Sequence, residues 1–141
     1  MKILFVLTLC IYLIGCAKKE LKESTDTPSA PVVNFYKFVT AGDSAGVINS
    51  FASTLREQFL SDKDTTTVRH MLENWKGVHA DVKVKDVKID STTPNLAKIY
   101  IRAVYTGKTL PVSDSIFFYV IKEDNEWKLS SLMPHRDEPR H

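Results

Sequence analysis

The feature that most constrains the fold is a change in the spacing of apolar residues midway along the chain. In the first half, apolar side chains such as Val32, Phe35 and Val39 recur every three or four residues, which is the spacing of one helix face. In the second half they alternate with polar residues, as Val82 and Val84 do, which is the spacing of a strand. Helices followed by strands predict an α+β fold, with the helices packed as one layer on a curved, mostly antiparallel sheet.

The first half predicts three helices. The first begins near Ser29, with a proline in its first turn, and ends at Gly42. The second is capped by Asp43 and has one continuous apolar face, made by Ile48, Phe51, Ala52, Leu55 and Phe59. The third spans about residues 67–76 and stops at Gly77, because glycine readily adopts the left-handed conformation that ends helices.

The second half predicts four strands. The first changes phase by one residue after Val84, which predicts a β-bulge near Asp86. The other three are centred on residues 99–105, 116–121 and 127–129. Residues 116–121 (IFFYVI) are apolar on both faces, so we expect this strand to be central or to be covered by a partner.

The N-terminus has the layout of a secretory signal. A charged start at Lys2 precedes an almost unbroken apolar run over residues 3–14, which is too short to span a membrane comfortably. The run ends in Leu13-Ile14-Gly15-Cys16, which resembles the bacterial lipobox, in which the cysteine receives a diacylglyceryl thioether and becomes the mature N-terminus. We therefore expect Cys16 to be the lipid attachment site and the protein to be anchored in the cell envelope.

This interpretation sets the expected domain boundaries. Residues 1–15 form the signal peptide, 16–29 the lipidated cysteine and a flexible tether, 30–133 the folded domain and 134–141 an unpacked tail. Ala17 is not the aspartate that favours inner-membrane retention in some bacteria, so we expect the outer membrane rather than the inner one.

Charge and cysteine content exclude several classes of function. The formal net charge is only +2, and basic and acidic residues are interspersed, so nothing predicts nucleic-acid binding. Cys10 lies within the signal and Cys16 would be acylated, so the mature domain has no thiol for a disulfide, a zinc site or a nucleophile.

One segment has calcium-loop spacing. Its possible ligands are Asp62, Asp64, Thr66 and Glu73. The sixth loop position needs glycine for its sharp turn and is Thr67 here, so we interpret the segment as a solvated loop before a helix. We predict no metal and no cofactor.

The candidate pocket residues are Tyr36, His70, Trp75, Asp81, Tyr105 and Phe118. His70 with Tyr36 or Asp81 could act as an acid and base, and the aromatic side chains could line a pocket for an apolar ligand. The alternative is an exposed histidine and a set of core aromatic residues, which is the commoner role for aromatic residues at helix and strand spacing. We therefore predict that the protein is not an enzyme.

Three stretches resemble small bacterial lipoproteins with an NTF2-like (cystatin-like) domain, the group called DUF4878. These are PVVNFYKFVTAGDSAGVINSF, VKVKDVKIDSTTPNLAKIYIRAVYTG and DNEWKLSSL, within about residues 30–132. The resemblance implies an NTF2-like cone with three N-terminal helices on a curved four-stranded sheet, but no established activity. The first hypothesis is a non-catalytic binding or interaction domain, with a homodimer or an envelope protein covering residues 116–121. The alternatives are a cone that binds a small apolar ligand and, third, an isomerase- or dehydratase-like enzyme.

Overall fold

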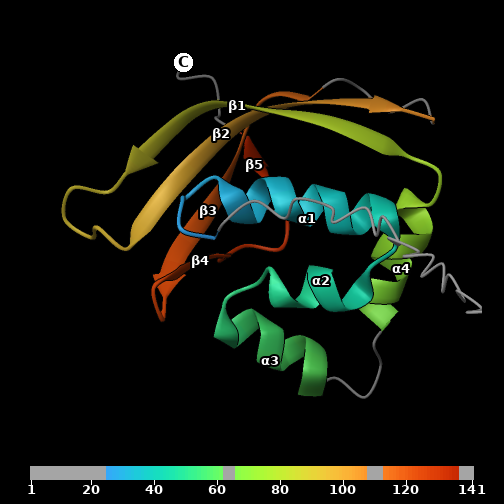
Figure 1. Cartoon of the computed structure of the whole chain (residues 1–141), viewed down its shortest axis with the longest axis horizontal. Coiled ribbons are helices and arrows are strands. Elements are labelled where there is room, and N and C mark those ends of the chain that lie inside the picture. The colour runs from blue at the N-terminus through green and yellow to red at the C-terminus, as the bar shows by residue number, and fades with distance from the viewer. Residues whose placement is uncertain (1–24, 62–65, 108–112, 137–141) are drawn as a thin grey trace, which may run out of the picture.

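The computed structural model describes residues 25–61, 66–107 and 113–136, which form helices followed by a curved antiparallel sheet. Figure 1 shows the long strands arching over one side of the first helix, with two further helices on its other side. The expected α+β architecture is therefore confirmed. None of the helices in the described part of the chain has the length and apolarity needed to cross a membrane.

The described residues form four helices rather than three. They are α1 (Ala30–Ala41), α2 (Ser44–Asn49), α3 (Ser53–Ser61) and α4 (Thr66–Trp75). The predicted first and third helices are confirmed, including proline in the first turn of α1 and glycine after each helix. Gly42 has φ of +71°, and Gly77 has φ of +77°, so both residues adopt the left-handed conformation expected at a helix end.

The single helix expected after Asp43 is wrong, because it is broken into α2 and α3. Ser50 and Ala52 bond instead to Leu129, 77 or more residues away in the sequence. The Leu129 N–H donates to the Ser50 carbonyl at 2.8 Å, and the Ala52 N–H donates to the Leu129 carbonyl at 2.8 Å. These bonds occupy backbone groups that a continuous helix would need, so the helix stops and restarts.

Five strands follow the helices in the described part of the chain. They are β1 (His79–Ile89), β2 (Leu96–Thr106), β3 (Ser113–Glu123), β4 (Glu126–Leu129) and β5 (His135–Arg136). The first four pair in the order β1-β2-β3-β4, all antiparallel, and β5 also pairs with β3. The register of β1 shifts between Val84 and Asp86, which confirms the predicted bulge.

The ends of the folded domain differ from the expected boundaries. We expected an unpacked tail from residue 134, but His135 pairs with Phe117 and Arg136 pairs with Ile116. We also expected the tether to reach Ser29, yet the carbonyl of Thr25 accepts a hydrogen bond from the Trp127 N–H at 3.1 Å. The packed chain therefore extends beyond both predicted limits.

The core lies between α1 and the inner face of the sheet. Its largest fully buried side chains are Phe51, Phe118, Ile99, Ile101, Leu129, Val32, Val39, Val47, Val78 and Val120. Burying a side chain of this size contributes about 1.5–3 kcal/mol. The alternation along β2, with Ala97, Ile99 and Ile101 buried, leaves the intervening residues on the opposite face of the sheet.

Candidate functional site

Four of the predicted pocket residues are brought together by four different elements. Tyr36 from α1 lies 5.6 Å from Trp75 of α4, measured between ring centroids, and 6.2 Å from Phe118 of β3. Tyr105 of β2 completes the cluster, with its ring 5.2 Å from Trp75. The hydroxyls of Tyr36 and Tyr105 are 3.3 Å apart and share a hydrogen bond.

This aromatic cluster fills the space that a ligand would need. Phe35 extends it toward Phe51 through an edge-on contact at 5.7 Å. Four surface hollows of the described residues are lined entirely by residues outside the aromatic cluster. Burial, with the Tyr105 hydroxyl beside it, raises the pKa of the Tyr36 phenol far above its usual value, so this group stays neutral.

The two proposed acid–base residues lie outside the aromatic cluster. His70 is on the exposed side of α4, with Nδ1 3.5 Å from Glu73 Oε2, and the two side chains are 62% and 60% exposed. Asp81 is also exposed, and it is opposite Val104 in the sheet, whereas its neighbour Val82 is opposite the buried Ala103. The structure therefore does not bring either residue to Tyr36.

The calcium pattern and the lipidation site fall largely outside the described residues. Asp62 and Asp64 lie in the undescribed segment 62–65, and Cys16 lies in segment 1–24. Of the remaining loop positions, Thr66 begins α4, and Glu73 is the carboxylate beside His70. Among the described residues, no group of three His, Cys, Asp or Glu could hold a metal ion.

The largest of the four hollows is a groove between the end of α1, α2 and α4, which we call the helix groove. It has a volume of about 660 Å³. Its apolar lining comes from Val39, Ile48, Val68 and Leu72, and its charged lining comes from Arg69, Glu73 and Lys76. The volume of the helix groove and its mixed apolar and charged lining are typical of a small-molecule site. The helix groove is not, however, the pocket that we predicted from the aromatic residues.

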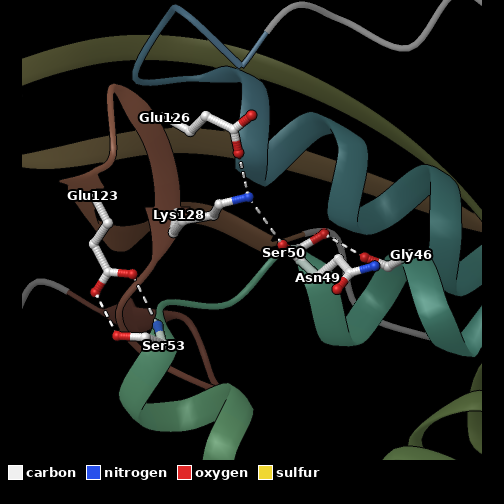
Figure 2. Close-up of polar contacts among 7 residues, drawn as sticks. All are labelled: Gly46, Asn49, Ser50, Ser53, Glu123, Glu126 and Lys128. Carbon is white, nitrogen blue, oxygen red and sulfur yellow. Dashed lines mark hydrogen bonds and ion pairs between the residues drawn. The ribbon is translucent and has the colours of Figure 1, made fainter.

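The second candidate site is polar and connects the break between α2 and α3 to the sheet, as Figure 2 shows. The Glu123 carboxylate accepts bonds from the Ser53 N–H at 2.9 Å and from the Ser53 hydroxyl at 3.1 Å. Nearby, Lys128 Nζ lies 2.7 Å from Glu126 Oε2 and donates to the Asn49 carbonyl at 3.3 Å. A carboxylate at the first N–H of a helix is a cap, so this site has a structural role.

The third candidate is the side of the sheet that points away from the helices, which we call the outer face. Its members in β1 are Asp81, Lys83, Asp86 and Lys88; in β2 Lys98, Tyr100, Arg102 and Val104; and in β3 Phe117, Tyr119 and Ile121. Along β2 basic and aromatic residues alternate on this face, whereas β1 contributes acidic and basic residues and β3 contributes aromatic and apolar ones. The sequence of each strand shows which residues share a face, but only the register shows that the basic residues of β1 and β2 adjoin one another.

The outer side of β3 is partly shielded by the chain itself. The His135 ring of β5 stacks on Phe117 at 5.4 Å with an interplanar angle of 23°. As a result, Phe117 is only 6% exposed, although it points away from the core. The strand is central, as expected, and β5 supplies part of the cover that we had assigned to a partner.

Comparison with known proteins gives little further identification. The sequence matches no established protein family and no curated protein. Among solved structures, the chain is similar to a domain of unknown function with a cystatin-like fold from Nostoc punctiforme. The identity is 17%, the TM-score is 0.47, and the match covers 78% of this chain and 75% of the other.

Proposed function

We propose that this protein is a lipid-anchored protein of the bacterial cell envelope, with an NTF2-like domain that binds a partner or ligand and does not catalyse a reaction. The anchor rests on the lipobox ending at Cys16 and the short apolar run before it. The NTF2-like assignment rests on the three stretches of similar sequence and on the helices-then-curved-sheet order. The outer membrane is the expected location, because alanine follows the lipidated cysteine.

The observation that carries the non-catalytic assignment is the filled interior. Enzymes of this architecture would need an open cone with an acid or base at its mouth. Here Tyr36, Trp75 and Tyr105 contact one another, and both His70 and Asp81 are exposed elsewhere. The surfaces that remain for function are the helix groove and the outer face.

The anchor is tested by growing cells with an alkyne fatty acid and detecting its incorporation into the protein. The unaltered chain should become labelled, and Cys16→Ser should not, because the thioether needs the Cys16 sulfur. Cys10→Ser is the matched control, since it removes the other cysteine and should leave labelling intact. Equal labelling of the unaltered chain and Cys16→Ser would contradict the anchor.

A second candidate function is the binding of a small apolar ligand in the helix groove, favoured by its volume of about 660 Å³ and its apolar lining. The test is the fluorescence of 1-anilinonaphthalene-8-sulfonate added to the folded protein. We expect Ser44→Trp, at the exposed wall of the groove, to abolish the fluorescence gain, because the indole fills the space. Lys37→Trp, exposed on α1 and outside the groove lining, should leave the gain unchanged. If both variants keep the gain, the dye binds elsewhere and the groove loses its support.

A further inference from the structure

We propose that the outer face of the sheet docks on the anionic headgroup surface of a lipid bilayer. The inference rests on the proposed anchor at Cys16, which would hold the domain beside a membrane, and it adds which side of the domain meets the lipid. Three independent observations support it: the arrangement of charge on the outer face, its aromatic residues, and the point where the chain leaves the domain.

One pair of like charges on the outer face is unfavourable for the isolated domain. Lys88 lies directly opposite Lys98, and Lys83 lies on the same side of β1. Like charges at directly opposed positions of an antiparallel pair destabilise a sheet. An anionic surface would remove this repulsion, since each lysine could then lie beside a phosphate.

Acidic residues on the outer face only partly offset these charges. Asp86 Oδ2 lies 3.8 Å from Lys88 Nζ, and both side chains are more than half exposed, so their attraction is weak. The other acidic member is Asp81, the next outer residue beside Lys83 on β1. Across β1, β2 and residues 117–121 of β3, four basic residues thus stand against two acidic ones. Beyond Ile121 the register continues this side of the sheet with Glu123, Glu126 and Lys128, whose side chains bond to α3, to α2 and to one another.

The aromatic residues suit the boundary between water and lipid. Lys88 Nζ lies 4.7 Å from the Tyr100 ring centroid, and Lys98 Nζ lies 5.3 Å from that of Tyr119. Both tyrosines are half-buried, so each presents part of an apolar ring together with a polar hydroxyl. Tyrosine and lysine side chains of this kind place their apolar parts against lipid and their polar ends in the headgroup layer.

The chain leaves the described domain at the edge of the same sheet. Thr25 bonds to the backbone of Trp127 in β4, and only residues 17–24 separate it from Cys16. That length of chain spans at most about 30 Å. The distance from β4 across the sheet to β1 is about 14 Å, as three strand spacings. A lipid on Cys16 therefore keeps the whole outer face within reach of the bilayer, which favours a membrane over a soluble polyanion as the occupant.

The test uses the mature chain from residue 16, coupled through its single thiol, Cys16, to a maleimide lipid in vesicles. This coupling supplies the anchor chemically, so the result does not depend on whether cells acylate Cys16. The reaction of each lysine with an acylating reagent is then measured by mass spectrometry on vesicles of phosphatidylcholine with or without phosphatidylglycerol. Lys37 on α1 and Lys76 after α4 serve as internal controls, because both are exposed and lie off the sheet.

We expect Lys83, Lys88 and Lys98 to react roughly fivefold more slowly on the anionic vesicles, with the protection lost at high salt. Lys37 and Lys76 should react equally on both vesicles. Equal reaction of the outer-face lysines on both vesicles would overturn the proposal, as would protection of Lys37 and Lys76 instead. Protection by a soluble anionic polysaccharide, without protection by anionic vesicles, would also overturn it and identify a glycan as the partner.

A second measurement uses the mature chain with Cys16→Ser, which has no anchor, and follows its flotation with anionic vesicles. Replacing both Lys88 and Lys98 by glutamine should weaken this binding by about 30-fold, because each basic residue near an anionic surface contributes about fivefold. Replacing both Lys37 and Lys76 by glutamine should change it little. Equal weakening by the two pairs would show that net charge alone, and not the outer face, determines binding, and would overturn the proposal.

Discussion

At the scale of single residues, Tyr36 best shows how the interior is closed. Its ring contacts Phe35, Trp75, Tyr105 and Phe118, and its hydroxyl bonds to that of Tyr105. A buried phenol with one hydroxyl partner is satisfied only while it is neutral. The residue that we considered as a pocket wall is therefore part of the core.

This environment predicts a loss of stability at alkaline pH. Below about pH 10 the Tyr36 phenol is protonated in both the folded and the unfolded chain, so it adds no pH dependence. Above that pH the unfolded chain releases the proton and the folded chain keeps it, because the folded pKa is raised. The free energy of unfolding should therefore fall by about 1.4 kcal/mol per pH unit from this group.

Urea unfolding of the unaltered chain and of Tyr36→Phe between pH 8 and 11.5 measures this contribution. At pH 8 the variant should be less stable by about 1 kcal/mol, because it loses the bond to Tyr105. The difference should shrink and then reverse as the pH rises, since the variant has no phenol at this position. Parallel curves over the whole range would show that Tyr36 is not shielded from water.

At the scale of the elements, the sequence predicted a feature correctly wherever residues close together in the chain determine it. Gly42 and Gly77 end helices because of their own backbone freedom, and the phase change after Val84 marks the bulge. The break at Ser50–Ala52 could not be predicted in this way. The apolar spacing continues through it, and the competing bonds come from Leu129 in β4. The pairing of His135 with Phe117 was missed for the same reason.

The Glu123–Ser53 contact gives a prediction about how α3 is attached. Glu123→Gln should lower the free energy of unfolding by about 1–2 kcal/mol, because a charged acceptor at the start of a helix becomes neutral. Glu57→Gln, at an exposed position within α3, is the matched control and should change stability by less than about 0.5 kcal/mol. Urea unfolding checks both values.

A double-mutant cycle with Ser53→Ala separates the hydroxyl bond from the backbone bond. Ser53→Ala removes only the hydroxyl donor and keeps the N–H that donates at 2.9 Å. The two substitutions should therefore show a coupling energy of about 0.5–1 kcal/mol. Strictly additive effects would mean that the charge of Glu123 does not strengthen the bond from the Ser53 hydroxyl.

At the scale of the whole molecule, net charge was a poor guide to the surface. A value of +2 for the full chain, with basic and acidic residues interspersed in sequence, led us to predict no nucleic-acid binding and gave no sign of a basic patch. Strand pairing then places Lys83 opposite Arg102 and Lys88 opposite Lys98, residues 19 and 10 positions apart. The layer order could be predicted from periodicity, whereas the composition of the outer face depends on register, which no single segment encodes.

In the whole molecule, the proposed anchor and the proposed docking surface are connected by a short segment of chain. The filled interior directs function to the exterior, and the short link between Cys16 and Thr25 places the edge of the sheet close to any membrane that holds the lipid. Both proposals place the lipid anchor at residue 16, which requires the acylation of Cys16 and the cleavage of the chain before it.

The most direct measurement is therefore the intact mass of the protein purified from bacterial membranes with detergent. Our account predicts a chain that begins at residue 16 and carries the added mass of a diacylglyceryl group on Cys16, with or without a further acyl chain on its amino group. Fragmentation should place the added mass on Cys16. A chain that retains Met1, or one that begins at another residue with no lipid, would contradict the account.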